Sequence, residues 1–157
     1  METVTRYEFF KFMHVAGAIV WLGAGVGLTV LWRGLTKAKE ADAIRAIGTQ
    51  NKALSAKVFG PAVLVTLAFG VAMVFDTPTF DFSDLFIILG FVGIGFSGAM
   101  NGAVADPATK RLVAAIESDG FDSPAAAAAR AKVRLAGNLE LLVLFAVVLA
   151  MVVKPGV

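Results

Sequence analysis

The sequence predicts an all-α integral membrane protein, an up-down four-helix bundle in which residues 1–157 form a single transmembrane domain. Apolar residues make up 58% of the chain and charged residues 17%, whereas soluble domains carry about 45–50% and about 25%. Four apolar stretches each provide the roughly 20 residues that cross a hydrocarbon core. The lysines and arginines gather in two of the three segments that join these stretches.

The first predicted span covers residues 9–32, in which Lys11 is the only fully charged residue. At 1.5 Å per residue this stretch is long enough to cross about 30 Å of hydrocarbon. Thr3 and Thr5 precede the span as candidate helix N-caps. The polar residues 33–52 that follow fit a helical extension or an interfacial helix, and equally a solvated connector.

The second and third predicted spans, residues 53–75 and 84–105, both involve prolines. Pro61 removes a backbone donor and is expected to kink the second span, which membrane helices tolerate. Pro107 disfavours helix at the residue before it and is expected to end the third span. The third span also contains a small-xxx-small pair, which predicts tight packing against other helices. This pair is Gly98 and Gly102.

The last helix is predicted to begin in water and to enter the membrane as a span over residues 133–153. Ser123 offers an N-cap, and Pro124 suits the first helical position. The alanines at 125–129 follow, and alanine has the highest helix propensity. We therefore expect one continuous helix whose first turns lie outside the bilayer.

The basic residues predict the orientation of the chain. Most of them fall in or beside the first and third connections: Arg33, Lys37, Lys39, Arg45, Lys52, Lys57, Lys110, Arg111, Arg130, Lys132 and Arg134. By the positive-inside rule both connections face the cytoplasm, whereas both termini and the acidic turn at 76–81 face outward. This predicts a multi-pass membrane protein, with the lipid bilayer as its first partner.

His14, the single histidine of the chain, is the first candidate site residue. It lies about five residues into the first span, roughly 8 Å below the outer interface. It fits a haem or metal ligand, a proton carrier or a quinone-binding residue, and it also fits a histidine that only fixes helix packing. Trp21, two turns away on the same face, would stack on a flat cofactor or seal the core. The other candidate companions at the level of the histidine are Met73, Ser83, Asp84 and Met151.

A second polar layer is predicted nearer to the cytoplasm, within about 10 Å of that interface by helical rise. Its members are Lys57, Asn101, Arg134, Asn138 and Glu140. Glu140 is the deepest acid and fits a carboxylate that exchanges protons or binds cations during transport. The alternative is a structural ion pair of Glu140 with Lys57 or Arg134 that locks the helices together.

Several function classes find no support in the sequence. It contains no phosphate loop, no metalloprotease pair and no glycine-elbow serine. One histidine and no cysteine leave no multi-histidine or thiolate metal site. The formal net charge of +2 is too small to indicate a nucleic-acid partner. We therefore expect a protein that is not an enzyme.

The stretch HVAGAIVWLG resembles the opening helix of small bacterial membrane proteins of the copper-resistance-D-like group and of related uncharacterised four-span families. The residues that carry the resemblance are His14, Gly17, Trp21, Leu22 and Gly23. The resemblance covers the first span and the general four-span layout, and it implies a location in a bacterial inner membrane. It implies metal handling near the outer face, and similar first helices in small haem-associated membrane proteins imply a haem site.

The expected function is that of a small non-catalytic membrane binding protein or a subunit of a membrane complex, with haem or a metal ion at His14 as the candidate ligand. The alternatives are an oligomeric proton- or cation-coupled transporter or channel that uses Glu140, and a purely structural subunit. Other membrane subunits or further copies of the chain are the expected protein partners.

Overall fold

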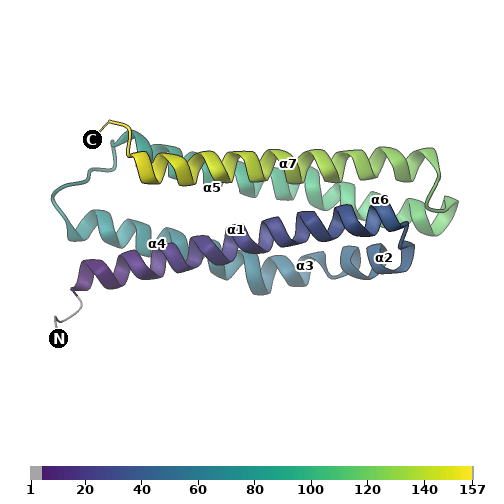
Figure 1. Cartoon of the computed structure of the whole chain (residues 1–157), viewed down its shortest axis with the longest axis horizontal. Helices are drawn as coiled ribbons and strands as arrows, with labels where there is room; N and C mark the ends of the chain where they lie inside the picture. The colour runs from purple at the N-terminus through teal and green to yellow at the C-terminus, as the bar shows by residue number, and fades with distance from the viewer. Residues whose placement is uncertain (1–4, 157) are drawn as a thin grey trace.

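The computed structural model describes residues 5–156, which form helices and turns and contain no strand. Four long helical segments run up and down along one axis, so that both ends of the chain lie at the same end of the bundle (Figure 1). Each segment is long and apolar enough to cross a membrane: Arg6–Ala38, Asn51–Asp76, Leu85–Asp119 and Pro124–Val153. The prediction of an all-α membrane bundle is therefore confirmed.

Two of the four segments are composite. The first segment is α1 (Arg6–Ala38), and a short helix, α2 (Ala41–Thr49), follows it. The second consists of α3 (Asn51–Leu54), η1 (Ser55–Phe59) and α4 (Gly60–Asp76). The third consists of α5 (Leu85–Met100), η2 (Asn101–Ala105) and α6 (Asp106–Asp119), and the fourth is α7 (Pro124–Val153).

The expectation that the helix of the third span ends before Pro107 is wrong, because the chain continues as helix through this residue. η1 and η2 are π-helical turns, and each ends two residues before a proline, Pro61 or Pro107. In η2 the N–H of Asp106 donates to the carbonyl oxygen of Asn101, five residues earlier. A π turn widens the helix locally, which relieves the clash between a proline ring and the carbonyl of the preceding turn.

The predicted helix starts are confirmed. Oγ1 of Thr5 accepts from the N–H of Glu8, whose carboxylate accepts from the N–H of Thr5, so the pair forms a capping box. Oγ of Ser123 accepts from the N–H of Ala126 at the start of α7. Thr3, the other candidate cap, lies outside the described residues. Residues 33–52 contain both the predicted extension of the first helix and a separate helix, α2.

The bundle consists of two helix pairs. α1 packs on α4, α7 packs on α5 and α6, and α1 and α7 join the pairs (Figure 1). At Gly17 the backbones of α1 and α4 meet directly, because a Cβ placed there would lie 2.6 Å from Oγ1 of Thr66 and 3.0 Å from the carbonyl oxygen of Ala62. Such contact requires a residue without a side chain, as is typical of membrane helix pairs.

The glycines of α5 pack differently from the prediction. The side chain of Met151 packs on Gly90 and that of Val147 packs on Gly93, so the close contact with α7 lies earlier in the span than the predicted pair. At Gly98 and Gly102 no atom lies within 4 Å of the position that a Cβ would take. The prediction that another described helix packs tightly on this pair is therefore wrong.

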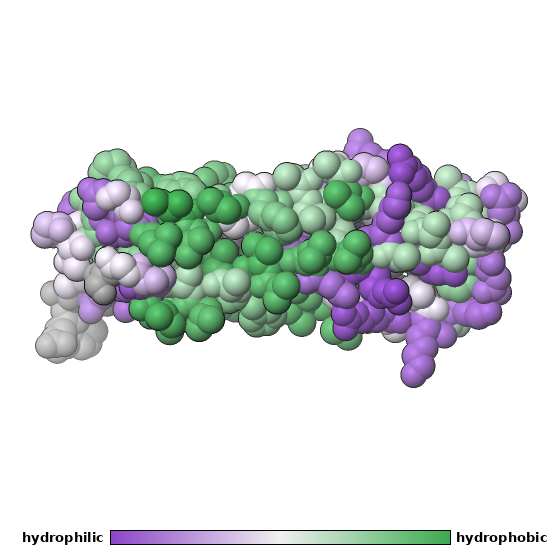
Figure 2. All heavy atoms as spheres, turned by 90° about the horizontal axis from the view of Figure 1, so that it is seen from above, coloured by the Kyte–Doolittle hydropathy of each residue, from purple (hydrophilic) through white to green (hydrophobic). Residues whose placement is uncertain are grey.

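The bundle contains two apolar cores. One lies at the end formed by α2, α6 and the first turns of α7, which we call the basic end because most lysines and arginines gather there; its Ile44 and Leu112 are 0% exposed. The other lies within the spans and centres on Trp21 and Leu144. Large apolar side chains remain exposed around the spans, because lipid chains are as apolar as these side chains and burial there gains no hydrophobic free energy. Figure 2 shows hydrophobic surface over the middle of the molecule and hydrophilic surface gathered toward the basic end.

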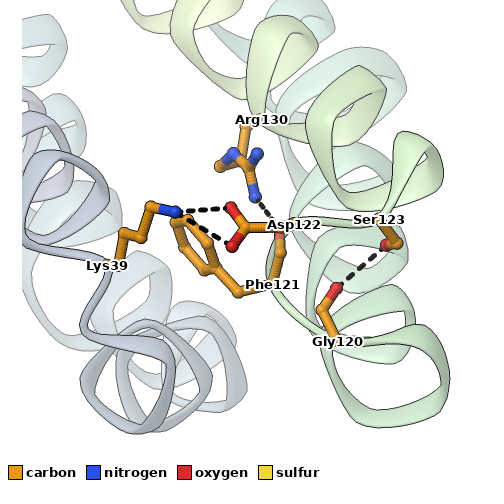
Figure 3. Close-up of polar contacts among 6 residues, drawn as sticks. All are labelled: Lys39, Gly120, Phe121, Asp122, Ser123 and Arg130. Atoms are coloured by element: carbon orange, nitrogen blue, oxygen red, sulfur yellow. Dashed lines mark hydrogen bonds and ion pairs between the residues drawn. The ribbon is translucent and has the colours of Figure 1, made fainter.

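Polar contacts hold the turn between α6 and α7 at the basic end. Nζ of Lys39, the residue that ends α1, lies 2.9 Å from both carboxylate oxygens of Asp122 (Figure 3). Arg130 donates to the carbonyl oxygen of Phe121 and stands 4.1 Å from the centre of its ring. These contacts tie the start of α7 to the end of α1.

Candidate functional site

His14 lies between α1 and α4. Its Nδ1 is 2.7 Å from the carbonyl oxygen of Thr66, and its ring lies against Gly70, where a Cβ would be 2.8 Å from Nδ1. A carbonyl oxygen only accepts, so Nδ1 is the donor in this contact. The ring is half-buried and contributes directly to the packing of the two helices.

Two predicted companions of His14, Met151 and Trp21, have packing contacts elsewhere in the bundle. Met151 packs on Gly90 in the pair of α5 and α7, whereas His14 packs in the pair of α1 and α4. Met73 lies on α4, about one turn beyond the glycine that the histidine ring contacts. Trp21 is buried in the core within the spans.

Two further candidate companions are engaged within their own turn. The hydroxyl of Ser83 donates to the carboxylate of Asp81, and the carboxylate of Asp84 accepts from the N–H of Asp81. Over residues 5–156 no group of three or more His, Cys, Asp or Glu side chains is placed to hold a metal ion.

Glu140 is held by two neutral donors. Its Oε1 accepts from Oγ of Ser97 at 2.6 Å and from Nδ2 of Asn101 at 2.9 Å. The sequence pointed to Asn101 but missed Ser97, which lies four residues earlier on the same face of the helix. This polar group joins α5 and η2 to α7.

The expected ion pair of Glu140 with Lys57 or Arg134 is wrong. The ion pairs of the described chain involve other residues, and both basic side chains are exposed. Helical rise placed the three residues at similar depths, but depth says nothing about the direction in which each side chain leaves its helix. Asn138, the remaining member of the predicted layer, accepts from Arg33 at 2.5 Å.

A cavity of about 420 Å³ lies between α1 and α7, and residues of η1 and η2 also line it. Its α1 wall extends from Trp21 to Lys37, which corresponds to about 24 Å along the helix axis. Of the predicted polar layer, Asn101, Arg134 and Glu140 line the cavity. No pattern in the sequence indicates this cavity, because its lining residues come from helices that are far apart in the sequence.

The cavity lining changes in character along its length. The inner part is apolar and aromatic, and the part toward the basic end carries charged side chains. The basic lining residues are Arg33, Lys37, Arg130 and Arg134, whereas Glu140 is the one acidic residue of the lining. We call the part of the cavity between these four basic residues the basic mouth.

The fold and the site define a multi-pass helical membrane protein with a cavity inside its bundle. Residues 8–155 match the family described as "Predicted integral membrane protein (DUF2269)", and the chain belongs to this family. No curated protein and no solved structure matches the chain. The family confirms the membrane class, whereas the resemblance to the copper-resistance-D-like group is not confirmed.

Proposed function

We propose that this protein is a non-catalytic membrane binding protein that holds a small molecule in the cavity between α1 and α7. The observation that carries the proposal is the position of Glu140, a carboxylate at membrane depth that lines the cavity. Ser97 and Asn101 bind its Oε1, whereas Oε2 accepts no hydrogen bond from another described residue and is free to accept one from a ligand. The cavity volume falls within the range of about 300–1,000 Å³ that is usual for ligand sites.

Two glycines of α1 provide a matched test of this proposal. Gly25 lines the cavity, whereas Gly23 has no atom within 4 Å of a Cβ position. The proteins are purified from native membranes in mild detergent and examined by native mass spectrometry. We expect a bound small molecule in the wild type and in Gly23→Leu, and its loss in Gly25→Leu. A wild type without bound mass, or a Gly25→Leu protein that retains it, would contradict the proposal.

Transport is the second candidate function. It is favoured by the carboxylate of Glu140, which has no basic partner among residues 5–156 and is therefore able to take up a proton or a cation. In this case proton-coupled flux into liposomes is present in the wild type and absent in Glu140→Gln, while thermal stability stays nearly unchanged. Liposomes that show no flux with either protein favour simple binding.

A haem at His14 is a further proposal, and the hydrogen bond of Nδ1 to a backbone carbonyl supports it. Ligating histidines usually donate their other ring N–H to such a group, which orients the ring and leaves Nε2 for the metal. We expect a Soret band in purified protein and its loss in His14→Ala, with membrane insertion retained. A preparation that stays colourless after addition of haem would leave His14 with its packing role alone.

We further propose that the basic end faces the cytoplasm of a bacterium and that both chain ends lie outside. The chain has no cysteine, so an introduced cysteine is unique. Cysteines at the exposed positions Lys39 and Ser118 should resist an impermeant thiol reagent in intact cells, whereas one at the exposed Thr79 should react. The opposite labelling pattern would show an inverted orientation.

A further inference from the structure

We infer that the ligand of the cavity is a single-chain amphiphile with an anionic head group, whose chain lies along the inner walls and whose head lies at the basic mouth. This inference rests on the proposed function, because it names the class of ligand for the same cavity. Three observations support it: the shape of the cavity, the order of its lining residues and the surplus of positive charge at its mouth.

The first observation is the elongated shape of the cavity. Its α7 wall extends from Leu144 to Ala127, about 26 Å along the helix, beside the wall of about 24 Å on α1. A volume of about 420 Å³ that extends over this length forms a narrow channel. Such a channel accommodates an extended chain better than a compact ring system.

The second observation is the order of the lining residues. Trp21, Leu144 and Phe59 at the inner part belong to the apolar core within the spans or pack against it. A hydrocarbon chain is stabilised on these walls by contact with apolar surface. Glu140 and Asn101 lie between this apolar part and the basic residues of the mouth. A ligand that is apolar at its inner end, donates a hydrogen bond to Glu140 and is charged at its outer end therefore matches the lining.

The third observation is the charge of the basic mouth. Lys37 and Arg134 are exposed and make no hydrogen bond or ion pair with another residue that the structure describes. Arg33 contacts the amide of Asn138, and Arg130 contacts a backbone carbonyl, so neither is neutralised by a carboxylate.

Acidic side chains at this end do not compensate the charge of the mouth. Three of them form ion pairs with other basic residues, namely Asp42 with Arg45, Asp106 with Lys110 and Asp122 with Lys39. Glu40, Glu117 and Asp119 form no ion pair with a described residue, but they do not line the cavity. Glu140 lies about 9 Å deeper than Arg134 along α7. A cleft that carries uncompensated charge of one sign attracts ligands of the opposite sign, so the head group is anionic.

The two tryptophans of the chain, Trp21 and Trp32, both line the cavity, so intrinsic fluorescence reports on its occupancy. The probe is an alkyl sulfonate that carries bromine atoms on its chain and quenches tryptophan on contact. The alcohol and the trimethylammonium compound with the same brominated chain serve as neutral and cationic comparisons. We expect saturable quenching of wild-type protein in a non-ionic detergent, with the sulfonate bound at least tenfold more tightly than either comparison.

Variants of the mouth separate charge from general packing. The double variant Lys37→Gln, Arg134→Gln should weaken sulfonate binding at least tenfold and leave the alcohol unaffected. The matched control is Arg111→Gln, Lys132→Gln, whose residues are exposed at the same end but do not line the cavity. This control should bind all three probes as the wild type does.

Each other outcome overturns a defined part of the inference. Equal affinity for the three probes, or sulfonate binding that does not change in the mouth variant, overturns the anionic head group. Displacement of the sulfonate by inorganic phosphate at equal concentration overturns the requirement for a chain. If probes bind without charge preference but Gly25→Leu abolishes binding, the proposed function stands and this inference fails. If Gly25→Leu leaves the quenching by every probe unchanged, both fail.

Discussion

Gly17→Ala is expected to lower the thermal stability of the protein strongly, because one added methyl group has no room between α1 and α4. Its Cβ would lie 2.6 Å from Oγ1 of Thr66, 2.9 Å from the backbone nitrogen of Thr66 and 3.0 Å from the carbonyl oxygen of Ala62. Two of these atoms belong to the backbone of α4, so the whole helix must shift. Overpacking of this kind costs about 1–3 kcal/mol. Displacement of the carbonyl that His14 contacts adds about 0.5–1.5 kcal/mol.

Gly23→Ala is the matched control for this prediction. It lies on the same helix, and no atom lies within 4 Å of its Cβ position. Alanine favours the helix by about 0.8–1.0 kcal/mol over glycine, so this variant should be neutral or slightly more stable. Thermal unfolding of both variants in the same detergent checks the prediction. Equal melting temperatures would show that α1 and α4 do not pack through Gly17.

Ile44→Ala is expected to destabilise the protein by about 2–5 kcal/mol, the usual cost of removing a buried isoleucine side chain. Ile44 is 0% exposed and packs with Leu112 in the core at the basic end. This core lies beyond the apolar spans, where water is the solvent and the hydrophobic effect acts in full. The loss of buried area and the cavity that remains therefore both lower the free energy of unfolding.

Ile19→Ala makes the same chemical change on the surface of the spans. Ile19 is 66% exposed, and its side chain faces lipid, which solvates alanine and isoleucine alike. We expect a change in the free energy of unfolding below about 0.5 kcal/mol. Denaturant unfolding followed by circular dichroism compares the two variants. Equal losses of stability would show that the basic end does not have a water-excluded core of its own.

The sequence predicted those features that depend on neighbouring residues. Thr5 and Ser123 cap their helices because a cap requires only a hydroxyl two or three residues before a free N–H. Pro107 misled the prediction for a related reason. The rule disfavours α-helical dihedrals at the residue before a proline, but Asp106 has φ −64° and ψ −48°, which are α-helical values. The continuous helix on both sides therefore overrides this local preference.

Long-range contacts of the site were predictable only in part. The sequence identified Asn101 and Glu140 as polar residues of similar depth, and they are bonded to each other. It also predicted a basic partner for Glu140, which is wrong. Helical rise gives the depth of a residue in the membrane but not the direction in which its side chain leaves the helix. The partner of His14 carried no signal at all, since Thr66 contributes its backbone carbonyl, which every residue has.

The π turn of η2 has a further consequence for the rotational phase of its helix. One extra residue in the turn rotates everything beyond it by about 100° relative to an uninterrupted α-helix. Deletion of one residue from η2 would restore the α-helical ladder and turn α6 about its axis, which would carry Leu112 and Ile116 away from the core that they share with Ile44. The contacts of Gly90 and Gly93 with α7 precede η2 and would keep their phase. The extra residue thus lets α5 and α6 form one continuous helix, although the side that packs in the bundle differs between them.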